Sequence, residues 1–291
     1  MKTLKLILKN YLLDINCLLI SDEAAIKKEF KLKKGYDLDL NNVRTFSEKI
    51  NYIKLYDHNP LMTVCSDKYR VLEYLKLFNL ENLFIDVIKV YSNPNQINFC
   101  ELPNDFIIKM NNMSGHNFIV NQSIDNNELE IKKHFKAIFK RNFYKLHREW
   151  AYKNIEPLII VQKIIKNRDG SPLVDYKFYC FEGKVAYFGV SIGEYDHHVK
   201  NHKYDRNLKS IDHLFKKESS LKDREISLPD NIKDMIYIAE KLSKPFHHVR
   251  VDLYNVDGRI YFGELTFYSN GGYIDIANED IDLKIGNLIN L

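Results

Sequence analysis

The chain has 291 residues, of which 45% are hydrophobic and 28% are charged, so it is long enough to bury a sizeable core. Its 43 basic and 39 acidic residues are too evenly balanced to indicate a nucleic-acid partner. No window approaches the roughly 20 apolar residues of a membrane span, and Lys5 and Lys9 interrupt the apolar run that a secretory signal needs. The four cysteines form no C-x-x-C pair, so free thiols are expected. These features predict a cytoplasmic globular protein.

Helical periodicity dominates residues 1–62. Apolar residues recur at helical spacing over 4–19, and further helices are predicted over 22–34 and 42–56. The first of these is basic and amphipathic, so it could rest on a membrane surface, but packing against the rest of the protein is favoured. This opening stretch is predicted to form an N-terminal helical module.

The next stretch contains a polar loop between two strands. Asp67 lies in the opening turn of a predicted helix, where a carboxylate suits the helix dipole. Further on, Lys109 ends an apolar strand just before a loop that contains Ser114 and Gly115. Backbone N–H groups, a hydroxyl and a lysine in that arrangement suit phosphate oxygens, although the sequence is not a Walker A motif. A short apolar strand over 156–165 follows.

Residues 166–291 are predicted to be mainly strands. Alternation places Asp175 and Lys177 on one face of a strand. The polar region 191–223 is expected to be a loop, and a helix is predicted over 231–242.

The segment 245–273 is predicted to be a β-hairpin, because polar and apolar residues alternate on both sides of the turn Asn255-Val-Asp-Gly258. In that register Asp252 lies opposite Glu264. Two facing carboxylates beside Arg250 make an oxygen-rich site that suits a magnesium ion holding phosphates. The alternative is an ordinary cross-strand pattern of charges on an exposed hairpin.

The histidines allow several interpretations. His198 and His202 are four residues apart and, with His197, could seat a metal if their segment were helical, but the polar surroundings favour a solvated loop. His116 lies in the predicted phosphate loop and is the first histidine to test. Two others precede Arg250 closely enough to touch a substrate, and structural roles are equally open for them: His247 and His248.

Five motifs occur in an order that resembles the ATP-grasp superfamily: Asp67-Lys68, Lys109 before a small-residue loop, a hinge strand at 159–165, Lys177, and Arg250-x-Asp252 followed by Glu264-x-Thr266. Three stretches are similar to its TupA-like branch, which is associated with bacterial surface-polysaccharide and teichuronopeptide synthesis: Glu149-Trp-Ala-Tyr-Lys153, Asp175-Tyr-Lys-Phe-Tyr-Cys-Phe-Glu-Gly-Lys184 and Gly263-Glu-Leu-Thr-Phe267. The resemblance runs from about residue 46 to residue 286.

The resemblance implies an α+β protein of ATP-grasp fold, in which two α+β lobes clamp ATP. The small lobe, with the phosphate-covering loop and the hinge, would comprise residues 63–165. The large lobe, with the metal and phosphate site, would comprise residues 166–291. ATP-grasp ligases transfer the γ-phosphate of ATP to a carboxylate, and an amine then attacks the acyl phosphate to give an amide.

The resemblance also implies roles for residues around ATP and Mg²⁺. The lysines that gather the phosphates would be Lys68, Lys109 and Lys177. Ser114 and Gly115 match the loop that covers the γ-phosphate and excludes water. The hinge whose backbone meets adenine would be Gln162, Lys163, Ile164 and Ile165, and the magnesium ligands would be Asp252 and Glu264.

Catalytic roles fall on Arg250, Lys177 and Ser114, with Arg250 steadying charge on the transferring phosphoryl group. The substrate-binding residues implied are His116, Arg250, Thr266, Asn270, Gly271 and Gly272.

Two residues depart from the family pattern. Thr266 stands where many ligases have an asparagine as third metal ligand, and Gln162 stands where the hinge commonly carries an acid.

The predicted function is that of an ATP-dependent carboxylate–amine ligase that acts through an acyl phosphate. Its substrates would be a uronic acid of a bacterial surface or capsular polysaccharide, or of its nucleotide-sugar precursor, and a small amine. Peripheral association with glycan-assembly enzymes is compatible with this function. The alternatives are an ATP-grasp kinase that stops at phosphoryl transfer and a scaffold that binds ATP without catalysis.

Overall fold

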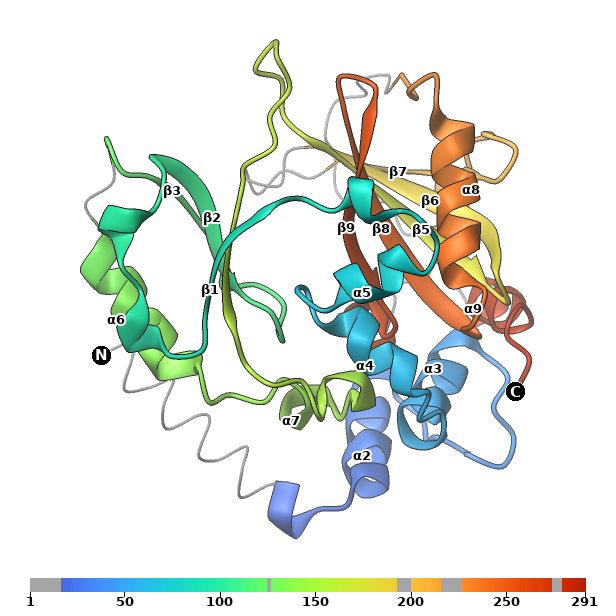
Figure 1. Cartoon of the computed structure of the whole chain (residues 1–291). Helices are drawn as coiled ribbons and strands as arrows, with labels where there is room; N and C mark the ends of the chain where they lie inside the picture. Colours follow the sequence, from blue (N-terminus) through green and yellow to red (C-terminus); the bar gives the residue numbers. More distant parts are fainter. Residues whose placement is uncertain (1–16, 125–126, 193–199, 216–226, 274–278) are drawn as a thin grey trace. The chain divides into compact units, whose positions relative to one another are not determined.

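The computed structural model describes residues 17–124, 127–192, 200–215, 227–273 and 279–291 (Figure 1). The chain forms two compact units, one comprising residues 1–29, 58–74 and 85–165 and the other residues 30–57, 75–84 and 166–291. Residues 1–62, predicted to be one helical module, are divided between them.

The described α-helices are α2 (Asp22–Lys34), α3 (Phe46–Tyr56), α4 (Pro60–Ser66), α5 (Val71–Lys76), α6 (Glu128–Ile138), α7 (Tyr144–His147), α8 (Ile232–Ser243) and α9 (Glu279–Gly286). The strands are β1 (Val87–Tyr91), β2 (Asp105–Met110), β3 (Phe118–Asn121), β4 (Ile159–Gln162), β5 (Val174–Phe181), β6 (Lys184–Ile192), β7 (Lys200–Asp205), β8 (His248–Val256) and β9 (Arg259–Thr266). The predicted helix over 4–19 lies largely outside the described residues.

The first unit contains an antiparallel four-stranded sheet with strand order β1-β4-β2-β3. Alternate residues of β2 point to one face, where Phe106, Ile108 and Met110 are fully buried. Helix α6 covers this face (Figure 1) and contributes its apolar stripe to the same core: Ile131, Phe135 and Ile138. The other residues of β2, including Lys109, therefore lie on the opposite face.

The second unit contains an antiparallel five-stranded sheet with strand order β7-β6-β5-β8-β9. Helix α8 packs on one face of this sheet against β5, β6 and β8 (Figure 1). The Cys180 thiol on β5 lies 3.8 Å from the Ala239 carbonyl of α8, which identifies the face that the helix covers. Because side chains alternate along a strand, Asp175, Lys177 and Tyr179 lie on the other face.

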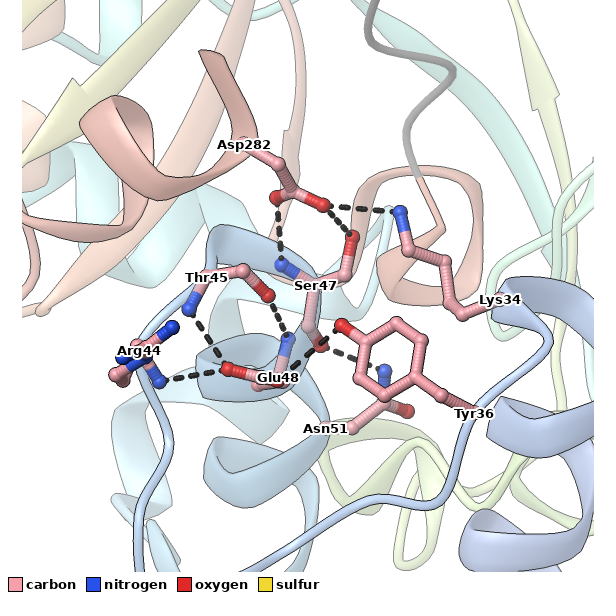
Figure 2. A network of polar contacts seen from close by, with 8 residues as sticks. All are labelled: Lys34, Tyr36, Arg44, Thr45, Ser47, Glu48, Asn51 and Asp282. Carbon is pink, nitrogen blue, oxygen red and sulfur yellow. Dashed lines mark hydrogen bonds and ion pairs between the residues drawn. The ribbon is translucent and has the colours of Figure 1, made fainter. Parts of the chain in front are cut away.

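Helix α3 is fixed at its N-terminus by an unusually complete set of bonds (Figure 2). Thr45 and Glu48 form a capping box, a motif whose cap residue typically contributes about 1 kcal/mol. Asp282 of α9 accepts bonds from the Ser47 N–H at 3.1 Å and the Ser47 hydroxyl at 3.0 Å. Lys34 donates to the same carboxylate at 2.9 Å. Helices α3 and α9 are thereby joined through a buried charge.

The structure corrects two expectations of local structure. The polar region 191–223, expected to be a loop, contains β7, an edge strand that pairs only with β6 among the described strands. The helix expected to open around Asp67 begins later, at Val71, and Asp67 itself caps the end of the preceding helix α4. Asp67 ends α4 and accepts bonds from the N–H groups of Tyr69 and Arg70, at 2.8 and 3.2 Å, ahead of α5.

Candidate functional site

The predicted hairpin is present, and its register places Asp252 of β8 directly across from Glu264 of β9. The turn between the strands lies at Asp257 and Gly258, both with positive φ (51° and 83°), as a two-residue hairpin turn requires. The adjacent strand β5 pairs Lys177 with Asp252 and Tyr179 with Arg250. Three strands therefore present charged side chains on one sheet face, the face away from α8.

Arg250 is the centre of this group. Its guanidinium donates to both carboxylate oxygens of Asp252, at 2.7 and 2.6 Å, in a planar two-bond arrangement. The Nη2 atom of Arg250 also reaches Glu264 Oε1 at 3.1 Å and Thr266 Oγ1 at 3.2 Å. The Thr266 hydroxyl in turn donates to Glu264 Oε1 at 3.1 Å. One arginine thus holds three side chains on two strands in a fixed arrangement.

Lys177 forms an ion pair with Asp175, two residues earlier on the same face of β5. Burial disfavours the charged ammonium, but the carboxylates of Asp175 and Asp252 outweigh burial and raise the pKa of Lys177. Lys177 is therefore a cation at neutral pH. The site combines two cations, Lys177 and Arg250, with three carboxylates, Asp175, Asp252 and Glu264.

Burial distinguishes this group from an exposed charge pattern. The side chains of Arg250 and Asp252 are only 12% and 6% exposed, whereas Glu264 is 37% exposed. Burial raises the pKa of the Asp252 carboxyl, and the Arg250 guanidinium opposes that rise. Although burial disfavours its charge, Asp252 and Glu264 hold the pKa of Arg250 well above its usual range. The alternative of surface charges on an exposed hairpin therefore does not describe Asp252.

Two stacked tyrosines, which the sequence pattern alone did not single out, lie beside Arg250. The rings of Tyr179 and Tyr187 are parallel, with centroids 4.4 Å apart. Tyr179 shares a strand face with Asp175 and Lys177, and this alternation was the available sequence signal. The Tyr187 hydroxyl is buried and has no hydrogen-bond partner among the described residues. Tyr179 pairs with Arg250 across β5 and β8, so the stacked tyrosines lie next to the ionic cluster.

The oxygen donors of Asp252 and Glu264 suit a magnesium ion, because Mg²⁺ prefers carboxylate oxygens together with phosphate oxygens and water. The two residues face each other across paired strands, and Glu264 retains exposed surface. The described residues contain no group of three or more His, Cys, Asp and Glu side chains arranged to hold a metal by themselves. A magnesium ion here would therefore depend on oxygen ligands from a bound substrate.

The first unit carries the other residues predicted to meet ATP. Lys109 of β2 pairs with Ile160, and two residues along, Ile107 pairs with Gln162 of β4, so Lys109 and Gln162 lie on the same sheet face. The Gln162 side chain is buried and donates to the Ile85 carbonyl at 3.2 Å. The N–H of Lys163 donates to the Asp86 carbonyl at 3.0 Å, and its ammonium lies 2.7 Å from the Asp86 carboxylate. Ile164 and Ile165 follow directly.

The end of β2 is tied to the turn that carries Lys68. The Lys68 N–H donates to the Asn111 carbonyl at 3.0 Å. The Asn111 side chain bridges to the Leu158 N–H, at 2.7 Å, and to the Glu156 carbonyl, at 2.9 Å. Burial raises the pKa of the neighbouring Asp67 carboxyl, against the opposing bonds from Tyr69, Arg70 and Asn111. The structure thus brings Lys68 close in space to the strand that bears Lys109.

The loop between β2 and β3 contains Ser114, Gly115 and His116. Gly115 and His116 both have left-handed backbone conformations, with φ of 72° and 57°. The His116 imidazole meets that of His134 on α6, with 3.0 Å between Nδ1 and Nε2. This contact joins the loop to α6, the helix that covers the sheet face opposite Lys109.

The segment after β9 carries the remaining predicted residues. Ser269–Gly272 forms a short 3-10 helix, called η6, in which Asn270 and Gly271 have left-handed conformations (φ 50° and 66°). Gly272 follows with φ of 82°.

Of the histidines proposed for a metal, His197 and His198 lie outside the described residues. His202 lies on strand β7 rather than on a helix, and its ring contacts Asp212 at 3.0 Å.

Comparison with protein families identifies the class. The TupA-like ATPgrasp family matches residues 48–290, which is most of the chain. This protein therefore belongs to the TupA-like ATP-grasp family, and its two antiparallel sheets with helices form the α+β fold expected for that family. Comparison with curated proteins found no match. Within the described residues, no helix combines the length and the apolar character needed to cross a bilayer.

Several solved structures are similar to this chain. One is a D-alanine–D-alanine ligase from Bacillus anthracis complexed with ATP, at 19% identity and TM-score 0.42, covering 70% of this chain and 55% of that one. Another is an L-amino acid ligase from Bacillus licheniformis, at 14% identity and TM-score 0.45, covering 88% and 56%. A third is the ATP-grasp ligase PsnB with minimal precursor, at 13% identity and TM-score 0.42, covering 79% and 60%. The chain thus spans little more than half the length of these proteins.

Proposed function

We propose that this protein is an ATP-dependent ligase that joins a carboxylate to an amine through an acyl phosphate. The observation that carries the proposal is the partly buried cluster of Lys177, Arg250, Asp252 and Glu264 on one face of three paired strands. Two fixed cations next to two carboxylates suit the stabilisation of a transferring phosphoryl group. Membership in the TupA-like ATP-grasp family supports the same chemistry.

In the proposed reaction, the substrate carboxylate oxygen attacks the γ-phosphorus of ATP, and the bond from that phosphorus to the bridging oxygen of ADP breaks. The amine nitrogen then attacks the acyl carbon, loses a proton, and phosphate departs as an amide bond forms. Arg250 and Lys177 would stabilise negative charge in both steps, because neither cation can easily lose its proton in this setting. Asp252 and Glu264 would hold magnesium, which neutralises phosphate charge when bound.

Within the first unit, we assign Lys68 and Lys109 to the phosphates of ATP, and the backbone of residues 162–165 to adenine. Ser114 and Gly115 would cover the γ-phosphate, since a hydroxyl and a backbone in an open, left-handed conformation suit close contact with oxygens. Thr266 and residues 270–272 would lie next to the acceptor substrate, with His116 at the loop. A closed loop would exclude water, which otherwise hydrolyses an acyl phosphate.

For the substrates, we propose a uronic acid of a surface or capsular polysaccharide, or of its nucleotide-linked precursor, and a small amine. The support is the association of the TupA-like branch with surface-polysaccharide synthesis. The reaction would take place in the cytoplasm, where ATP and nucleotide-linked sugars are available.

The test is a screen of nucleotide-linked uronic acids with small amines for ADP release, followed by mass spectrometry of the product. A ligase gives ADP release that depends on both substrates and a product whose mass equals acid plus amine minus water. A stable phosphorylated product formed without amine would instead identify a kinase. Glu264→Gln is the inactive comparison, and Asp234→Asn, an exposed carboxylate on α8, is its matched control. Absence of Mg-ATP binding by calorimetry would overturn both enzymatic assignments.

A further inference from the structure

Lys54 of α3 is a lysine in an unusual environment, because its side chain is only 2% exposed. Its ammonium donates to the Gly271 carbonyl at 2.5 Å and to Asn51 Oδ1 at 3.0 Å. The same nitrogen lies 5.1 Å from the centre of the Tyr273 ring. A charged group is costly to bury unless it is well bonded. An apolar side chain at this position could not make the hydrogen bonds that the ammonium donates to Gly271 and Asn51.

Two of the three named contacts belong to the segment after β9, residues 269–273. Asn270, Gly271 and Gly272 have consecutive left-handed conformations, with φ of 50°, 66° and 82°. L side chains rarely adopt such a conformation, and Asn270 is the non-glycine residue of this run. A strained backbone of this kind persists only where neighbouring groups hold it. The Lys54 ammonium bonds the carbonyl of Gly271, which directly follows Asn270.

Helix α3 also touches this segment sterically. A β-carbon at Gly272 would lie 2.9 Å from Cγ2 of Ile50 and 3.1 Å from Nδ2 of Asn51, so only glycine fits without a shift. The segment therefore lies directly on the helix, with the carbonyl of residue 271 bonded and residue 272 in close contact. The position of residues 271 and 272 therefore depends on the position of helix α3.

The helix itself is a fixed support. Its N-terminus is held by Asp282 through Ser47, and Asn51 donates to the Ser47 carbonyl at 2.8 Å (Figure 2). The side chain of Asn51 then accepts the bond from Lys54. A continuous series of bonds thus runs from the α9 carboxylate, through about two turns of α3, to the Gly271 carbonyl.

We propose that Lys54 is a positioning residue that sets the conformation of residues 269–273 and, through it, the binding of the amine acceptor. The structural half of this statement stands on the contacts above. The acceptor half rests on the proposed ligase function. Lys54 acts through the segment and need not touch either substrate.

The experiment compares Lys54→Met with Lys49→Met. Lys49 lies on the same helix and also donates its ammonium to a backbone carbonyl, that of Ile289, at 2.8 Å, but it is not bonded to the segment. Hydrogen exchange of peptides that cover residues 267–273 is measured in the nucleotide-free protein. We expect exchange about tenfold faster in Lys54→Met, because a hydrogen bond from a charged donor is lost, and unchanged exchange in Lys49→Met. Lys54→Gln, which keeps a donor, should lie between Lys54→Met and the wild type.

Unchanged exchange in Lys54→Met, or an equal increase in both methionine variants, overturns the proposal. If Lys54→Met does not fold, exchange in Lys54→Gln that equals the wild-type rate overturns it as well. In turnover with a uronic acid and amine identified by ADP release, Lys54→Met should raise the KM for the amine about tenfold and leave the Kd for Mg-ATP within twofold of wild type. An unchanged KM for the amine refutes the acceptor half. If the wild type shows no ligase activity, the proposed function fails while the exchange data still decide the role of Lys54.

Discussion

His116 and His134 bond to each other through their imidazoles, with 3.0 Å between His116 Nδ1 and His134 Nε2. This contact joins the loop after β2 to helix α6, and the His134 ring also packs edge-on against Phe118 and Phe135. Burial lowers the pKa of both histidines, and the charges of His134 and Arg141 lower that of His116 further. Both rings are therefore neutral at pH 7, and one can donate to the other.

We predict that the loop loosens in acid. A histidine with a lowered folded-state pKa contributes stability above its ordinary value of about 6.5, and that contribution is lost as the pH falls below it. Hydrogen exchange of residues 112–117, corrected for the intrinsic effect of pH, should accelerate between pH 7.5 and pH 5. His134→Ala should show fast exchange at both pH values, while His213→Ala, at an exposed position in the other unit, should behave like the wild type. A loop that exchanges equally at both pH values in the wild type contradicts this role.

Lys109 and Lys177 are predicted to bind the phosphates of ATP. Replacing either with Met should weaken Mg-ATP binding by roughly ten- to a hundredfold, since a charge-assisted bond contributes about 1.5–3 kcal/mol. Calorimetry with Mg-ATP provides the measurement. Lys184→Met, which removes an exposed lysine from neighbouring strand β6, should leave the affinity unchanged. Wild-type affinity in both test variants would remove these lysines from the phosphate site.

Glu264→Gln should cut turnover by at least about a hundredfold with little change in melting temperature, because this side chain is 37% exposed and its loss leaves Arg250 paired with Asp252. Asp252→Asn should reduce turnover as strongly but also lower the melting temperature, since it removes the main partner of a buried guanidinium. Turnover at saturating Mg-ATP and thermal melts separate the two effects. Near-normal turnover in both variants would exclude the magnesium site.

His248 provides a prediction about stability alone. Its ring lies between Phe46 and Phe181, and burial lowers its pKa to about 3. Because the unfolded chain takes up the proton at about pH 6.5 and the folded chain does not, stability falls by about 1.4 kcal/mol per pH unit between pH 6.5 and pH 3 from this group. His248→Phe should unfold with a shallower dependence on pH in denaturant titrations. A dependence identical to that of the wild type would show that other groups govern acid unfolding.

The hairpin was predictable because local rules determine it. Alternation indicated the strands, Asp257-Gly258 indicated the turn, and the register then placed Asp252 opposite Glu264. The burial of Asp252 and its two bonds from Arg250 were not predictable, because neighbouring strand β5 completes that environment from 75 residues away along the chain. Strand β7 was missed for a related reason. An edge strand needs few apolar residues, so its polar sequence resembles a loop.

Long-range bonds limited the prediction of the helices as well. The capping signal at Thr45 is local, and it indicates where α3 begins. Nothing near residue 54 shows that its lysine is buried, since a lysine on an amphipathic helix is ordinarily exposed. The contact with Gly271, 217 residues later, determines its environment.

The bond between Ser47 and Asp282 spans 235 positions of the chain. During synthesis, α3 leaves the ribosome long before the carboxylate that completes its N-terminus exists. Until α9 emerges, the Ser47 N–H and hydroxyl lack that partner, and the support beneath residues 269–273 is incomplete. Residues 269–273 can therefore gain this complete support only after the ribosome has made α9, so nascent chains that have already produced β8 and β9 should still hold this segment less firmly than the finished protein.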